Sequence, residues 1–232
     1  MKKISFIGAY DKTDLIIYIA RILVGMKKKV LVIDATINQK AKYVVPVINP
    51  SKTYVTEFEG IDVAVGFNKI TEIKNYIGIT EEENLNYDYV LYDIDSSESF
   101  NNYNIEDSIE KYFVTSFDLY SLKKGIEILA STNKELKLTK VYFAREVHKE
   151  DDEYLNFLAK DYNIEWNEEK IYFPFEMGDQ TTIAENQRVS KIKLKKLTQS
   201  YKEGLMYIIE QIMEDNEIGN LRKVFRQLER GV

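Results

Sequence analysis

The sequence predicts an α/β fold with a single doubly wound, mostly parallel sheet and helices on both faces. Three observations support this prediction. Short apolar runs of strand length alternate with longer helical patterns along the 232 residues. The run VLVID at 30–34 is apolar up to its last residue, as expected of a strand buried on both faces. Finally, no internal repeat and no low-complexity linker divides the chain.

The first 34 residues predict a β-α-β unit. Residues 3–8 form a short apolar run, and residues 14–24 are apolar on nearly every side, which is typical of a buried strand followed by a buried helix. Gly25 and the lysines at 27–29 predict the end of this helix, because glycine and cations are favoured there. Residues 30–34 then form a second buried strand, which should pair in parallel with the first.

The same alternation continues through the rest of the chain. Residues 53–67 alternate around Glu59-Gly60, which predicts a hairpin near a sheet edge. Further strands are predicted at 87–95, 110–117, 138–144 and 169–175, and helices at 70–83, 121–133, 151–160 and 197–214. We therefore expect one domain over residues 1–215, followed by a tail over residues 216–232 that ends in a basic amphipathic helix.

Composition excludes several classes of site and partner. With 32 basic and 38 acidic residues, the net charge of −6 argues against a surface committed to nucleic acid. The absence of cysteine excludes disulfides, thiolate catalysis and Cys-ligated metals, and the single histidine, His148, argues against a histidine base. Asp11 and Lys12 interrupt the apolar start, and the apolar stretch 15–26 contains Arg21, so neither a secretory signal nor a membrane span is predicted. We expect a cytoplasmic protein.

The turn GAYDKTD at 8–14 is the first candidate site. Ligands of open parallel sheets bind beyond the carboxyl ends of the strands, and a helix N-terminus favours an anion. Lys12-Thr13 is typical of the end of a P-loop, where the lysine contacts phosphate and the hydroxyl contacts Mg²⁺. The alternative is an ordinary helix start with Thr13 or Asp11 as the N-cap.

The stretch FIGAYDKTDLIIYIARILVGMKKKVLVIDAT resembles the opening of the ParA/MinD group of deviant Walker-motif ATPases, where a KGGxGKT loop precedes a long helix and a VLVIDAD-like strand. The similarity continues in order with YDYVLYDID, VTSFDLYSLKKGIEIL and IYFPFEMGDQTTIAENQ, over about residues 1–214. The resemblance implies a P-loop NTPase-like fold of the MinD/ParA type. It implies nucleotide contacts by Gly8, Lys12, Thr13, Asp34 and Asp93, with Thr13 and Asp93 serving Mg²⁺ if a nucleotide binds.

The two aspartates carry an alternative interpretation. Asp34 and Asp93 each follow a buried strand and match by position the family's water-orienting and Mg²⁺-associated aspartates, with Asp95 as a further candidate. An aspartate at a strand end also commonly caps the following turn through hydrogen bonds to the backbone.

The departures from the family pattern concern catalysis. The alignment places Asp11 on the last loop glycine, Phe6 on the first glycine and Ile7 on the signature lysine, which in the family reaches the partner's nucleotide across a dimer. A carboxylate ~4 Å from a phosphate charge costs about 4 kcal/mol at an effective dielectric near 20. Losing an electrostatic stabiliser of the transition state commonly costs about 10²-fold in rate. Ala144 and Arg145 replace the asparagine that recognises adenine. We expect no catalytic residues, and either no cofactor or weakly bound Mg·ATP.

Two functions follow from the resemblance. The first is a non-hydrolysing, dimeric positioning or scaffold protein that recruits an assembly. TadZ/CpaE-like proteins of pilus assembly carry degraded P-loops on this fold, which suggests a secretion or pilus ATPase as partner. The second is an active ATP-dependent switch on a membrane or nucleoid. A DNA-binding partition role would rest on the lysines of KIKLKK at 191–196, for which a solvated face is the simpler interpretation.

The tail offers a further contact surface. Ile218, Leu221, Val224, Phe225 and Leu228 fall on one side of a helix, and Arg222, Lys223, Arg226 and Arg230 on the other. The tail resembles the C-terminal amphipathic helix that anchors MinD to membranes. Residues 221–226 and Leu228 are therefore candidates for contact with a partner or with the inner face of the membrane. The alternative is that the apolar stripe packs against the chain's own core or a second copy.

Overall fold

The computed structural model describes residues 1–48, 51–80, 82–144, 146, 148–174 and 176–231. Its strands are β1 (Lys2–Ile7), β2 (Val30–Asp34), β3 (Tyr54–Phe58), β4 (Ile61–Val65), β5 (Tyr89–Ile94), β6 (Glu110–Thr115), β7 (Leu136–Phe143) and β8 (Ile164–Phe173). They form one sheet in the order β3-β4-β2-β5-β1-β6-β7-β8. The β3–β4 hairpin is antiparallel and lies at one edge, and the other neighbouring strands pair in parallel. The predicted fold class and the edge position of the hairpin are confirmed.

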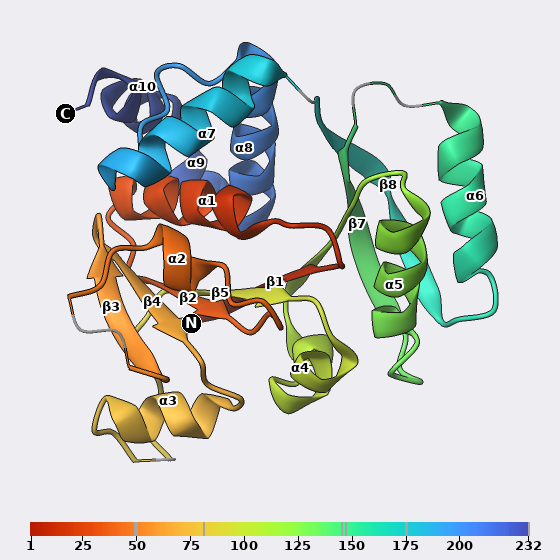
Figure 1. Cartoon of the computed structure of the whole chain (residues 1–232), viewed down its shortest axis with the longest axis horizontal. Coiled ribbons are helices and arrows are strands. Elements are labelled where there is room, and N and C mark those ends of the chain that lie inside the picture. Colours follow the sequence, from red (N-terminus) through yellow and green to blue (C-terminus); the bar gives the residue numbers. More distant parts are fainter. Residues whose placement is uncertain (49–50, 81, 145, 147, 175, 232) are drawn as a thin grey trace.

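Helices cover both faces of this sheet (Figure 1). They are α1 (Thr13–Gly25), α2 (Ala41–Val44), α3 (Ile70–Tyr76), α4 (Ser97–Asn102), α5 (Leu119–Leu129), α6 (Lys149–Ala159), α7 (Met177–Val189), α8 (Gln199–Ile212), α9 (Asp215–Ile218) and α10 (Leu221–Arg230), with a 3₁₀ turn at Ile105–Asp107. One core packs α1, α8 and α10 against one face of the sheet. The other core packs α3, α4, α5 and α6 against the opposite face. Each face therefore buries its own layer of apolar side chains.

The strand order places a crevice at the centre of the sheet. The predicted pairing of residues 30–34 with the first strand is wrong, because β5 lies between β1 and β2 and pairs in parallel with both. From β1 the chain crosses to β2 on one side, and after β5 it continues on the other side with β6. The pairing registers place Asp93 beside Phe6 on one neighbouring strand and beside Asp34 on the other. The ends of β1, β2 and β5 thus meet at one point, which is where doubly wound sheets bind ligands.

Some predicted boundaries differ from the structure. The helix predicted at 70–83 ends at Tyr76, because the chain turns at Gly78 with a φ of +78°. β8 begins at Ile164, five residues before the predicted start, and its first half is only partly buried. That half therefore lacks the apolar pattern of a buried strand.

The C-terminal helix packs on the domain. The side chains of Leu221, Phe225 and Leu228 are buried in the same core as α1, and Val224 packs against it. This arrangement corresponds to the alternative in which the apolar stripe covers the chain's own core. In this structure the chain's own core covers Leu221, Phe225 and Leu228, and their contact with a membrane or partner stays a prediction. Among the described residues, no helix is long and apolar enough to cross a bilayer.

Candidate functional site

The loop before α1 is short and tightly placed. β1 continues through Phe6 and Ile7, and both side chains are fully buried in the core. Gly8 has a φ of +145°, and a Cβ at this position would lie 2.1 Å from the carbonyl oxygen of Val114 on β6. No other residue fits there. Ile7, at the position aligned with the signature lysine, is therefore part of the sheet and cannot present a cation.

Lys12, Thr13 and Asp93 meet at the N-terminus of α1. The Lys12 side chain is 1% exposed; its Nζ donates to the Gly8 carbonyl oxygen at 2.9 Å and lies 2.8 Å from Asp93 Oδ1. Thr13 Oγ1 donates to Asp93 Oδ2 at 2.8 Å. Asp11 Oδ1 also accepts the Thr13 backbone N–H at 3.3 Å, but the N-cap residue of α1 is Lys12, so the alternative with Thr13 or Asp11 as the N-cap is wrong. Four of the five residues expected to contact a nucleotide are thus brought together.

The fifth residue, Asp34, has a different set of contacts. Its carboxylate accepts the backbone N–H and hydroxyl of Thr36 and the backbone N–H of Ala41, at 2.6 to 3.1 Å. These bonds close the turn after β2 and start α2, which is the turn-capping role considered as the alternative. Burial, together with the nearby charge of Asp93, raises the pKa of Asp34 to about 6, although its own hydrogen bonds lower it.

This raised pKa gives the first testable prediction. We expect the ¹³C signal of the Asp34 carboxyl to titrate with a midpoint near pH 6, above the ordinary 3.8. Because the folded state binds this proton more tightly than the unfolded state, Asp34 favours folding most below about pH 4, and this contribution is lost as the pH rises through 6. Asp93→Asn should lower the midpoint. A wild-type midpoint near 4 would contradict this account.

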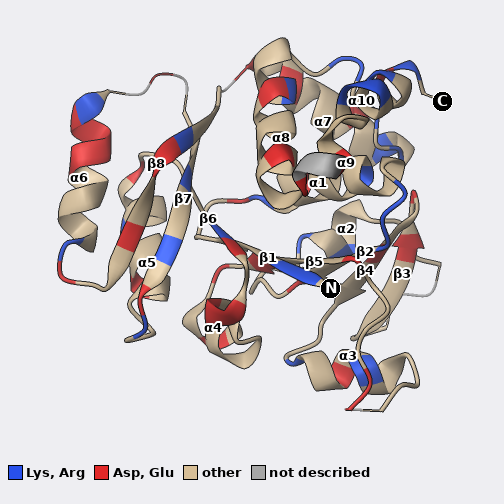
Figure 2. Ribbon diagram, turned by 180° about the vertical axis from the view of Figure 1, so that it is seen from behind, with Lys and Arg blue, Asp and Glu red and all other residues tan. Residues whose placement is uncertain are grey.

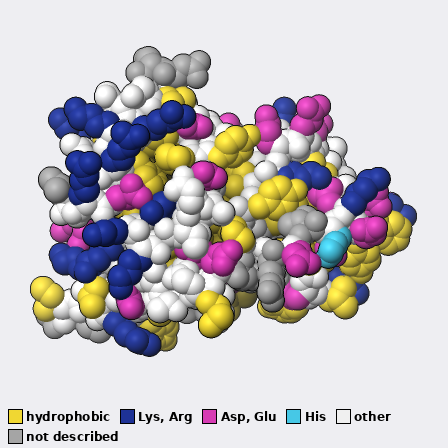
Figure 3. All heavy atoms as spheres, turned by 90° about the horizontal axis from the view of Figure 1, so that it is seen from above, with side chains coloured by type: hydrophobic (Ala, Val, Ile, Leu, Met, Phe, Trp, Pro, Cys, Tyr) yellow, Lys and Arg dark blue, Asp and Glu magenta, His cyan; other side chains and the backbone are white. Residues whose placement is uncertain are grey.

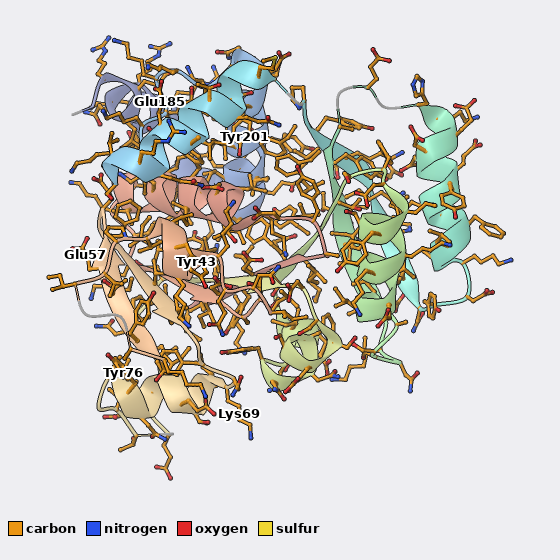
Figure 4. All side chains as sticks on the ribbon, in the orientation of Figure 1. Tyr43, Glu57, Lys69, Tyr76, Glu185 and Tyr201 are labelled. Carbon is orange, nitrogen blue, oxygen red and sulfur yellow. The ribbon has the colours of Figure 1, made fainter. Side chains whose placement is uncertain are left out.

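A polar cavity of about 440 Å³ opens beside these residues. It is lined by Ala9, Tyr10, Asp11, Lys12, Thr13, Thr36, Asn38, Lys40, Tyr43, Asp93 and Asp95. Tyr43, one of these lining residues, belongs to α2 and is labelled in Figure 4. The lining carries two ammonium groups against three carboxylates, one of which, Asp95, accepts the Ile37 backbone N–H at 2.9 Å. The cavity is large enough for a phosphate group, but its net charge favours a phosphate that arrives with a cation.

A second cavity, of about 290 Å³, lies on the other side of Tyr10, Asp11 and Lys40 and is more apolar. Tyr10 stacks on Phe143 with ring centroids 4.9 Å apart, which fixes the loop against the end of β7. Tyr201 of α8, labelled in Figure 4, forms part of the far wall. The aromatic lining suits an organic group rather than a bare anion.

The donor set partly fits a nucleotide with Mg²⁺. Lys12 and the N-terminus of α1 suit a phosphate, and Thr13 with Asp93 suits Mg²⁺. Within the described ranges, no group of three or more His, Cys, Asp or Glu residues forms a metal site, so the ion would need phosphate oxygens as further ligands. Asp11 and Ile7 do not fit, because the family pattern has a glycine and the signature lysine at these two positions. Arg145 lies outside the described residues, and the neighbouring Ala144 offers no side chain that could recognise a base.

Sequence reasoning missed Lys40, Tyr10 and the wall formed by α7 and α8. Lys40 lies in an irregular segment for which no element was predicted, and only its position shortly after a strand ending in aspartate could have drawn attention to it.

No protein-family model matches this sequence, and no curated protein matches it. Solved structures do match. A structure described as a plasmid partition protein from Borrelia burgdorferi B31, bound to AMPPNP, has 14% identity and a TM-score of 0.58, over 91% of this chain and 99% of that one. A ParA family ATPase from Chlorobium tepidum TLS has 12% identity and a TM-score of 0.53, over 98% of this chain and 97% of that one. A chain of the MinC:MinD cell division protein complex of Aquifex aeolicus has 13% identity and a TM-score of 0.52, over 92% of this chain and 98% of that one.

These likenesses define the fold class. The sheet order, the helices on both faces and the loop at the N-terminus of α1 are those of a P-loop NTPase fold. Within that class, the fold is of the ParA/MinD type.

Proposed function

We propose that this chain is a non-hydrolysing protein of the ParA/MinD fold that acts as a positioning protein or scaffold and recruits a partner assembly. The observation that carries the proposal is the burial of Ile7 in β1, at the position aligned with the signature lysine. Charge that develops on a γ-phosphate lacks that stabiliser, and positioned charges supply most of the catalysis in phosphoryl transfer.

Weak Mg·ATP binding without turnover is part of this proposal. Lys12, Thr13 and Asp93 retain the contacts that a phosphate and Mg²⁺ need, and a structural neighbour of this fold is bound to AMPPNP. These contacts are also the observation that favours the alternative, an active ATP-dependent switch on a membrane or nucleoid.

The proposed scaffold forms a homodimer and binds a protein partner, for which a secretion or pilus ATPase is our candidate. One neighbour of this fold is in complex with MinC, which supports protein recruitment as a use of the fold. We place the protein in the cytoplasm, with peripheral contact at the inner face of the membrane through the basic side of α10. The exposed residues of that side include Arg222, Lys223 and Arg226.

The basic side of α10 is part of a larger charged area. Figure 2 shows Lys and Arg on α10 and on segments beside it, and Figure 3 shows basic side chains gathered at that end of the molecule. Lys202 connects α10 to the lysine-rich run, since its Nζ lies 2.6 Å from Glu229 and donates to the Lys195 carbonyl oxygen at 3.3 Å. An acidic surface on a partner, or anionic lipid, suits this area.

Hydrolysis and binding assays test the proposal. At millimolar Mg·ATP we expect a rise in Tm of a few degrees, because a ligand at about five times its Kd adds about 1 kcal/mol. Phosphate release should not exceed that of Lys12→Ala, which serves as the control for contaminating ATPases. Turnover that disappears in Lys12→Ala would instead establish the switch.

A further inference from the structure

Lys40 holds an unusual position between the two cavities. It precedes α2, and its Nζ lies 2.5 Å from Asp11 Oδ2 and 2.5 Å from Asp14 Oδ2. The two carboxylates belong to the loop and to the first turn of α1, whereas Lys40 comes from the connection after β2. Lys40 lines both the polar and the aromatic cavity. The Lys40 ammonium group therefore connects the loop to the first turn of α1 at the point where the two cavities meet.

The two cations of the polar cavity differ in their freedom. Lys12 is almost completely buried and is committed to Asp93 and the Gly8 carbonyl oxygen. The Lys40 side chain is 30% exposed and bonds to carboxylates at the mouth of the loop. Burial lowers the pKa of Lys40, but the nearby charges of Asp14 and Asp11 raise it by more. The pKa therefore lies above its ordinary value, and the group stays protonated. Lys40 is thus a protonated, partly exposed cation whose partners are two carboxylates near the surface.

The two carboxylates that pair with Lys40 differ in their exposure and in their other contacts. Asp14 has a second contact, because its Oδ1 accepts from Gln187 Nε2 of α7 at 2.8 Å, and its side chain is 18% exposed. Asp11 is 55% exposed, so water can solvate its carboxylate when Lys40 leaves. Breaking the Asp11–Lys40 pair therefore costs little, since exposed ion pairs contribute about 0–1 kcal/mol.

We propose that Lys40 is the phosphate-contacting cation of this site, released from Asp11 when a polyphosphate enters the cavity beside Lys12. A phosphate chain carries several negative charges and outcompetes one exposed carboxylate for the ammonium group. Lys40 thereby adds a second cation for anion binding, from the connection after β2. This inference rests on the anion site of the proposed function.

Asp11 then has two effects on anion binding. Asp11 repels phosphate and also holds Lys40 at the mouth of the loop while no anion is bound. Removing its charge should both relieve the repulsion and free Lys40. Asp11→Asn and Lys40→Met are therefore expected to change affinity in opposite directions, whereas a merely structural clamp would weaken folding in both variants.

Calorimetric titration with tripolyphosphate in the presence of Mg²⁺ tests this, with Mg·ATP as the second ligand. We expect Lys40→Met to raise the Kd about tenfold or more, Lys40→Arg to retain most of the affinity, and Asp11→Asn to lower the Kd. Lys42→Met is the matched control, because Lys42 lies on α2, two residues after Lys40, and bonds to Gln39 instead of lining either cavity. Its Kd should stay within twofold of the wild type.

Three results would be decisive. A Kd for Lys40→Met equal to or below that of the wild type overturns the inference and leaves the anion site standing. No binding of either ligand by the wild type also overturns it and removes Mg·ATP binding from the proposed function, while the scaffold role itself remains. Phosphate release that depends on Lys12 instead removes the scaffold proposal and leaves the role of Lys40 intact. Circular dichroism verifies folding, and the opposite sign expected for Asp11→Asn keeps the test informative if Lys40→Met folds poorly.

Discussion

Replacing Lys12 by methionine is expected to lower the free energy of unfolding by about 3–5 kcal/mol, although the new side chain has a similar length. The Lys12 ammonium and the Asp93 carboxylate are both almost completely buried, 2.8 Å apart. Without Lys12, the charge of Asp93 stays in the interior with the Thr13 hydroxyl as its remaining described donor. Urea unfolding followed by circular dichroism measures the change.

Two further variants separate this cause from general damage. In the double variant Lys12→Met/Asp93→Asn no charge remains unpaired, so we expect it to recover much of the lost stability. Lys137→Met is the surface control, because Lys137 and its partner Glu165 are both more than half exposed and 3.6 Å apart. It should change stability by less than about 1 kcal/mol. A loss below that level in Lys12→Met would show that the buried pair does not determine the stability of the site.

The sequence was sufficient to predict the fold because its central strands are buried on both faces. β2 and β5 are buried along their whole length, so their sequences are apolar almost without interruption and leave little ambiguity. No helix was predicted over α7 from the residue pattern. Its buried residues are Asp179, Thr182 and Asn186, whose polar groups bond to neighbouring segments, so it has no apolar stripe to detect.

The candidate site was predictable where it depends on strand ends. Lys12, Thr13 and Asp93 come together because the parallel neighbours β1 and β5 end at the same edge of the sheet, and the sequence predicts a buried strand before each of these positions. The bridge from Lys40 to Asp11 and Asp14 depends on the path of an irregular connection, and no local pattern encodes that path. The contacts of Asp34 were likewise open, since the same residue type serves a metal or a turn.

The C-terminal helix α10 contributes to the stability of the domain through its buried side. Phe225→Ala should lower the free energy of unfolding by about 3–5 kcal/mol, because the Phe225 side chain is 4% exposed and packs in the core that α1 shares. Arg226→Ala, on the exposed side of the same helix, should leave stability within about 0.5 kcal/mol. Chemical unfolding of both variants gives the comparison.

Vesicle binding then distinguishes packing from anchoring. If α10 stays on the domain, its basic side alone contacts an anionic surface, so Arg226→Ala should weaken binding to phosphatidylglycerol vesicles and salt should abolish it. If α10 instead leaves the core and inserts, Phe225→Ala should weaken vesicle binding at high salt and cost little stability, because the free helix would already be detached. The burial of Leu221, Phe225 and Leu228 favours the first result, since releasing them would expose three large apolar side chains at about 1.5–3 kcal/mol each.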